Sequence, residues 1–174
     1  MSVFSPVWSS LNFFFKADGE RTELEFFKKV SLFEDLTSRE VQKVMRIMHA
    51  RSFKHGEYIF HKGQPGAAFY IIRKGTVRVV QPGEKVVDIA ELTEGELFGE
   101  LSILDDSPRS ASALTEGETE LKAVFKHDFD KLLYHEPVIA AKVYRKVAII
   151  IGMRLKITND QYLEKIRKTG DTHV

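Results

Sequence analysis

The sequence predicts a mainly β protein with flanking helices, in the order N-terminal helices, a small β barrel or sandwich, and a long C-terminal helix. Helical periodicity marks both ends of the chain. The middle contains short runs rich in β-branched and aromatic residues, and glycines recur between these runs. With 174 residues the chain is long enough for one domain with a real core and some additional helix.

The N-terminal helices are predicted over residues 21–49. A short first helix, Glu23–Val30, places apolar residues on one face. Thr37 and Glu40 have the three-residue spacing of a capping box, which predicts that a second helix begins here. The apolar residues that follow recur at helical period and are Val41, Val44, Met45 and Met48.

The β region begins near residue 50, where glycines become frequent. Strands are predicted at 58–60, 69–72, 76–80, 86–89, 110–115 and 120–125. Short strands at this spacing, separated by glycine-containing turns, are typical of a small barrel or sandwich. Gln81-Pro82-Gly83-Glu84 predicts a hairpin turn between two of the strands.

The C-terminal region returns to helical periodicity. Residues 128–134 fit a short helix, and Pro137 fits the first turn of a long one. Along the long helix, steps of three and four alternate through Ala141, Tyr144, Ala148, Ile151, Leu155, Thr158 and Tyr162. This spacing predicts a helix that pairs with a partner, so we expect a homodimer formed through it. The expected units are an aromatic extension at 1–22, a barrel with its N-terminal helices at 23–136, and the long helix at 137–170.

Composition excludes several classes of site. The chain has no cysteine, which removes disulfides, thiolate zinc sites and cysteine nucleophiles. Its net charge of +1 supplies no overall field that would recruit nucleic acid or an anionic membrane. The six histidines form no H-x-H pair and no nucleophile–base set is visible, so we expect neither a metal site nor enzyme activity.

Targeting segments are not evident in the sequence. The first cation of the apolar N-terminus is Lys16, and polar residues interrupt the apolar ones, unlike a signal peptide. The apolar run Val147–Ile151 is far shorter than the ~20 residues that span a bilayer. We therefore expect a cytoplasmic protein without membrane association.

An isolated arginine is the most informative feature of the chain. Between Val86 and Leu121, Arg109 is the only basic residue. The acidic residues of the same stretch are Asp88, Glu91, Glu94, Glu96, Glu100, Asp105, Asp106, Glu116, Glu118 and Glu120. A single cation in so acidic a stretch requires an explanation.

The segment FGELSILDDSPRSASA, residues 98–113, resembles the phosphate-binding cassette of cyclic nucleotide-binding domains. These are the sensor domains of cAMP-dependent kinase, cyclic-nucleotide-gated channels and the catabolite activator family. The glycines and the run FYII upstream, at residues 63–75, are also similar to the family pattern, and the resemblance covers about Phe26–Tyr162. It implies a β jelly-roll barrel (a double-stranded β-helix) and a non-catalytic sensor that binds a cyclic nucleotide and needs no cofactor.

The resemblance assigns roles to the cassette residues, which are Phe98, Gly99, Glu100, Leu101, Ser102, Arg109, Ser110 and Ala111. A guanidinium matches the two free oxygens of a cyclic phosphodiester bidentately, which is the role expected of Arg109. Gly99 would let the backbone approach the ligand, and Ser110 could donate a further hydrogen bond. A short helix over Glu100–Leu104 would direct its first N–H groups at the phosphate. Glu100 would accept the ribose 2′-hydroxyl.

The base is assigned less directly. In relatives of the catabolite activator type, polar residues of the long helix reach the adenine amino group from both chains, which here implies Thr158 and Asn159. Thr158 could instead only fix the register of the helix pair. Tyr162 could stack on the base or pack in the seam, and we favour packing. We expect cAMP as the ligand, with cGMP as the alternative because Ser110 does not discriminate between them.

Three other functions agree less well with the sequence than a sensor does. A truncated or atypical catabolite-activator-type transcription regulator is the main alternative, acting on DNA or through a partner. Only LEKIRKTGDTHV follows Tyr162, too short for a helix-turn-helix, so we do not expect direct DNA binding. A cupin-like metal enzyme and a domain that only joins partners agree less well with the intact cassette. The effector is unknown, and the aromatic N-terminus could pack on the protein itself or dock on a partner.

Overall fold

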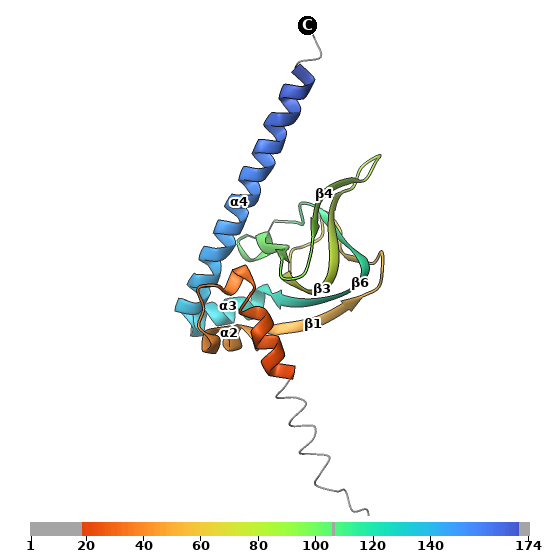
Figure 1. Ribbon diagram of the computed structural model, residues 1–174. Helices are drawn as coiled ribbons and strands as arrows, with labels where there is room; N and C mark the ends of the chain where they lie inside the picture. The colour runs from red at the N-terminus through yellow and green to blue at the C-terminus, as the bar shows by residue number, and fades with distance from the viewer. Residues whose placement is uncertain (1–18, 106, 171–174) are drawn as a thin grey trace, which may run out of the picture.

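The computed structural model describes residues 19–105 and 107–170. Helical elements flank a β barrel: residues 19–27, η1 (Ser31–Phe33) and α2 (Ser38–Met45) precede it, and α3 (Lys126–His135) and α4 (Pro137–Gly170) follow it. The strands are β1 (Met48–Phe53), β2 (Tyr58–Phe60), β3 (Ala68–Gln81), β4 (Val87–Leu92), β5 (Leu97–Phe98) and β6 (Ser112–Phe125), and η2 (Glu100–Ile103) follows β5. Figure 1 shows α4 running past the barrel, with the other helices gathered around its first half. The predicted class and element order are confirmed.

Two long strands organise the barrel. β3 and β6 pair antiparallel along their length, β1 and β2 pair with β6, and β4 and β5 pair with β3. The β3–β6 register shifts on both sides of Lys74, beside Gly75, which has a φ of 95°. A Cβ at Gly75 would lie 2.7 Å from the carbonyl oxygen of Glu118, so only glycine fits this close approach. The bend lets each long strand serve both parts of the jelly roll.

This bend corrects two strand predictions. The segments 69–72 and 76–80 are parts of one strand, and so are most of 110–115 and 120–125. Gly75 and Gly117, both with positive φ, lie inside the strands. Glycines that we expected to end strands therefore bend them instead. The predicted turn after Gln81 is confirmed, since β3 ends at Gln81 and β4 begins at Val87.

The boundary between helix and barrel was also predicted incorrectly. The capping box is confirmed: the Thr37 N–H donates to Glu40 Oε2 (2.7 Å), and the Glu40 N–H donates to Thr37 Oγ1 (3.3 Å). Helix α2 ends at Met45, however, and Met48 begins β1, where it pairs with Val124. A partly buried methionine satisfies either period, and pairing with β6 decides between them.

Alternation along β3 divides two hydrophobic cores. Phe69 and Ile71 face the helices, in a cluster with Phe27, Phe33, Val44, Phe129 and Val143. Ile72 and the partly buried Tyr70 face the barrel interior, with Val77, Leu92, Phe98 and Leu121. Because successive side chains of a strand point to opposite faces, β3 joins the helical layer to the barrel.

The first half of α4 is held against the N-terminal helices by ion pairs. Lys142 contacts Glu40 (2.8 Å), Arg145 contacts Asp35 (2.8 Å) and Lys146 contacts Glu34 (2.7 Å). Three basic residues of this helix therefore have acidic partners. This pairing leaves less positive charge available for nucleic acid.

Two sequence predictions concern other features. The aromatic residues of the N-terminus lie within 1–18, outside the described residues. Over the part of the chain that the structure describes, no helix is both long and apolar enough to cross a bilayer.

Candidate functional site

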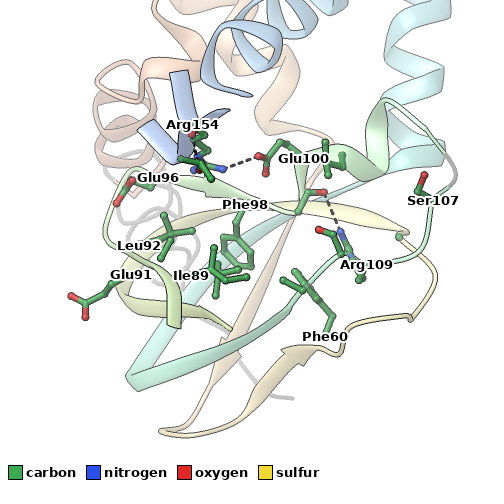
Figure 2. Close-up of a pocket in the computed structure, with 18 of the residues that line it drawn as sticks. Phe60, Ile89, Glu91, Leu92, Glu96, Phe98, Glu100, Ser107, Arg109 and Arg154 are labelled. Atoms are coloured by element: carbon green, nitrogen blue, oxygen red, sulfur yellow. Dashed lines mark hydrogen bonds and ion pairs between the residues drawn. The ribbon is translucent and has the colours of Figure 1, made fainter. Parts of the chain in front are cut away.

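A cavity of about 450 Å³ lies between the barrel and α4. This volume is within the range of small-molecule sites, about 300–1,000 Å³. The cassette, β2, β3, β4 and the middle of α4 all contribute to its walls. Figure 2 shows Arg109 and Phe60 at one end, Glu100 and Arg154 at another, and Ile89 with Leu92 along the β4 side.

Arg109 is buried in the cavity wall and only 8% exposed. Its Nη2 donates to the carbonyl oxygen of Ala68 (2.6 Å) and its Nη1 to that of Gly99 (3.1 Å). The guanidinium carbon lies 4.1 Å from the centre of the Phe60 ring, a cation–π distance. These contacts orient the fork, and they use only part of its five N–H donors.

One donor of this guanidinium has no partner. Nε of Arg109 is buried and makes no hydrogen bond to any residue that the structure describes. A buried donor left unpaired costs about 1–3 kcal/mol, so such groups require an explanation. An anionic ligand in the cavity would supply the missing acceptor.

Arg109 remains positively charged although it is buried. Burial lowers the pKa of its guanidinium, while the phenol of Tyr70 and the carboxylate of Glu100 act in the opposite direction. An arginine stays protonated despite such a shift, because its ordinary pKa is so high. A buried cation that forms no ion pair with the carboxylates of the described residues is suited to bind an anion.

Gly99 shapes the backbone at the anion end. It has a φ of 70° and caps η2, the short helix that we predicted at Glu100–Leu104 and that the structure places at Glu100–Ile103. A Cβ at Gly99 would lie 2.8 Å from Nη1 of Arg109. The position therefore needs glycine both for its left-handed conformation and for the arginine beside it.

Glu100 is buried, 8% exposed, and bound to α4. Its Oε1 accepts a hydrogen bond from Nη1 of Arg154 (2.7 Å), while Nη2 of Arg154 donates to the carbonyl oxygen of Leu97 (2.6 Å). Figure 2 shows this bridge across the cavity. We did not predict a site role for Arg154. Its place one turn before Thr158 was the available clue, because residues four apart share a helix face.

The structure brings most of the predicted site residues together. Those that line the cavity are Phe98, Gly99, Glu100, Leu101, Arg109, Ser110, Ala111 and Thr158. Ser102 lies in η2, but its side chain is outside the described part of the chain.

Asn159 does not line the cavity of the single chain. It lies about 140° around α4 from Arg154, since successive helical residues turn by about 100°. Asn159 is therefore not placed to contact a base in the cavity of its own chain. Its predicted role would have to be played across a dimer.

Other cavity residues were not predicted from the sequence. The main ones are Phe60, Val79, Ile89, Leu92, Ile157 and Gln161. Phe60, Val79 and Ile89 belong to strands that were predicted, but alternation alone does not tell which face meets a ligand. Ile157 and Gln161 share the α4 face with Arg154, so the helical period could have indicated them.

Comparison with known proteins identifies a family whose ligands suit this cavity. The family model described as "Cyclic nucleotide-binding domain" matches residues 50–136. The cyclic AMP receptor protein of Thermus thermophilus is 35% identical over 127 residues, which are 72% of this chain and 57% of the relative. The cAMP-dependent protein kinase regulatory subunit of Hypocrea atroviridis is 31% identical, over 62% of this chain and 23% of the relative.

A solved structure agrees with the fold. The crystal structure of a cyclic nucleotide-binding domain from Methylobacillus flagellatus has a TM-score of 0.73 and 27% identity, covering 82% of this chain and 81% of that one. The chain therefore belongs to the cyclic nucleotide-binding domain family. It has the jelly-roll fold of this family and is a regulatory, cyclic nucleotide-binding domain. The chain spans 57% of the cyclic AMP receptor protein and 23% of the kinase regulatory subunit.

Proposed function

We propose that this chain is a non-catalytic cAMP sensor that signals through α4. The observation that carries the proposal is Arg109, buried in the wall of the cavity with no acceptor for its Nε in the described part of the chain. A cyclic nucleotide has about 22 non-hydrogen atoms, and ~0.3 kcal/mol per atom corresponds to a Kd of about 10 μM.

The sugar is expected beside Glu100. The carboxylate is buried and accepts from Arg154 through Oε1, which leaves acceptor capacity for a ribose 2′-hydroxyl. A 2′-deoxy ligand would leave that capacity unused in a buried place. Discrimination against such a ligand follows, because sites built to hydrogen-bond a hydroxyl reject analogues that lack it.

A route from the cassette to α4 supports the signalling step. Ile103 of η2 is buried in the helical core, and Tyr144 of α4 donates its hydroxyl to the Ile103 carbonyl oxygen (3.2 Å). Arg154 of α4 contacts Glu100 directly. A ligand that binds one position of α4 more tightly than another shifts the population toward that position by its differential affinity.

The output is proposed to involve a homodimer through α4. Leu155, Tyr162 and Ile166 are 59%, 64% and 50% exposed and lie within a narrow sector of the helix. Such a stripe has the spacing of a helix that pairs with a second copy. Tyr144, which we placed in the same seam, packs instead on Phe129 of α3, so the proposed pairing begins beyond it.

Sedimentation of the wild type and of Leu155→Glu tests the dimer. We expect a wild-type dimer at micromolar concentration and a monomeric variant, because the new charge lies in the centre of the seam. Lys156→Glu, on the same turn but outside the seam, is the control and should remain dimeric. A monomeric wild type would contradict the homodimer.

Titration calorimetry with cAMP, cGMP and 2′-deoxy-cAMP tests the ligand assignment. We expect binding of cAMP near the estimated 10 μM or tighter, weaker binding of cGMP, and a marked loss for 2′-deoxy-cAMP. Absence of binding by any cyclic nucleotide at millimolar concentration would overturn the sensor function. Equal binding of cAMP and its deoxy analogue would overturn only the role of Glu100.

A further inference from the structure

The base of the proposed ligand would occupy the part of the cavity away from Arg109. Arg109 and Gly99 define the anion end, and Glu100 lies between it and α4. The remaining walls include apolar side chains, with Ile89 and Leu92 of β4 on one side and Ile157 of α4 on another. Such walls suit the flat faces of a purine, so its selectivity has to come from polar groups at its edge.

Four polar side chains line this end, namely Glu91, Glu96, Thr158 and Gln161. The carboxylate of Glu96 accepts from Thr93 N (2.8 Å) and Thr93 Oγ1 (3.2 Å), which closes the turn before β5. Figure 2 shows the carboxylates of Glu91 and Glu96 turned away from Phe98. Two side chains of α4, Thr158 and Gln161, are left to meet the base.

Their position follows from the helix. Arg154, Thr158 and Gln161 lie on one face of α4, and Arg154 is anchored to Glu100 and to the Leu97 carbonyl oxygen. The Cα of Gln161 is about 10 Å along the helix axis from that of Arg154. Helical side chains tilt toward the N-terminus, so the long Gln161 side chain reaches back toward Thr158. Gln161 is an exposed residue and one of those that line the cavity.

The two side chains offer different hydrogen-bonding capacity. Thr158 Oγ1 donates to the carbonyl oxygen of Arg154 (2.9 Å), so toward a ligand it can only accept. An acceptor at this place favours a 6-amino purine over a 6-oxo purine. The amide of Gln161 both donates and accepts, which matches the 6-amino group and N7 of adenine bidentately, whereas a 6-oxo purine presents two acceptors at the same edge.

We propose that Gln161 is a specificity-determining residue, which together with Thr158 reads the 6-amino edge of the purine. The inference rests on the proposed cyclic nucleotide function and adds a base contact made within a single chain. It requires no residue from a second copy, unlike the contact predicted for Asn159.

The test compares cAMP with cyclic inosine 3′,5′-monophosphate, which carries a 6-oxo group and an N1–H in place of the 6-amino group and the N1 acceptor of adenine. Titration calorimetry is performed on the wild type, on Gln161→Met, which keeps the side-chain length, and on Gln42→Met, the same change on an exposed glutamine of α2. We expect the wild type and Gln42→Met to prefer cAMP. We expect Gln161→Met to lose about tenfold in cAMP affinity, with a smaller loss for the inosine analogue.

The outcomes distinguish the role of Gln161 from the sensor function. If the wild type binds cAMP and Gln161→Met keeps the wild-type ratio of the two affinities, the role of Gln161 is wrong while the sensor function stands. This outcome includes an equal loss of affinity for both ligands, because a loss of packing alone would not distinguish the groups at the 6-position. If the wild type binds neither nucleotide, the sensor function fails and the inference with it.

Discussion

Arg109 shows how one side chain acquires two roles from its surroundings. Its contacts with Ala68, Gly99 and Phe60 hold the cassette to β2 and β3, and its Nε has no acceptor among the residues that the structure describes. A substitution will therefore change both local stability and ligand binding. The charge and the forked shape of the guanidinium can be separated by comparing a variant that removes both with one that keeps only the charge.

Replacing Arg109 with alanine should weaken cAMP binding by about 2–5 kcal/mol, as expected when one member of a buried charge pair is removed. Arg109→Lys should also bind weakly, because an ammonium cannot reproduce the bidentate fork. Calorimetry on folded variants measures both. Arg78→Ala, which removes an exposed arginine paired with Asp88, is the control and should bind normally. A loss below tenfold for Arg109→Ala would contradict the anion role.

Gly99→Ala should impair binding through the arginine. The new Cβ would lie 2.8 Å from Arg109 Nη1, in a residue with a φ of 70°. Gly95→Ala is a matched control, since Gly95 has a φ of 85° but no atom within 4 Å of a new Cβ. Urea unfolding should show a loss of about 1–2 kcal/mol for both variants from backbone strain. Only Gly99→Ala should lose cAMP affinity, and equal affinity of the two variants would contradict the steric argument.

At the scale of elements, the attachment of α4 to α2 has a charged component. Hydrogen bonds from Lys142 and from the Thr37 N–H lower the pKa of Glu40 to about 2. The same carboxylate therefore caps α2 and holds α4. Protonation of Glu40 therefore weakens two contacts, the cap at the start of α2 and the ion pair with Lys142 of α4.

The pH dependence of stability should report this carboxylate. Its pKa is lower in the folded state than its ordinary value of 4.5, so its contribution is complete above that value and is lost as the pH falls toward 2. Urea unfolding of the wild type and of Glu40→Gln between about pH 6 and pH 2 measures the difference in free energy of unfolding. That difference should shrink as the pH falls. A difference that stays constant over this range would show that Glu40 titrates normally.

At the scale of the whole molecule, the ligand is expected to join two layers that the chain builds separately. The barrel supplies the anion end of the cavity, and α4 supplies Arg154, Ile157, Thr158 and Gln161. A molecule that contacts both layers binds the native state and not the unfolded chain. Binding should therefore raise the stability of the whole domain.

Thermal unfolding measures this linkage. A ligand present at 100 times its Kd adds about 2.7 kcal/mol. With about 2–4 °C per kcal/mol for a protein of this size, cAMP should raise the Tm by about 5–10 °C. The acyclic 5′-AMP, which presents a different phosphate geometry, is the control and should shift it little. An unchanged Tm with saturating cAMP would contradict binding in the cavity.

Much of this protein was determined by patterns that act over a few residues. The capping box of Thr37 and Glu40, the turn after Gln81 and the start of α4 at Pro137 depend on neighbouring side chains and backbone, so the sequence predicted them correctly. The cassette was also predictable, because its residues from Phe98 to Ala111 lie in one continuous stretch.

Only the tertiary structure decided the rest, because those features depend on residues distant in the chain. Met48 joined β1 through its pairing with Val124, and Gly75 bent β3 because β6 passes close to it. Arg154 contacts Glu100 although the two residues are 54 positions apart in the chain. The predicted cassette thus became half of a cavity, and the position of α4, set by ion pairs and packing with distant helices, supplied the other half.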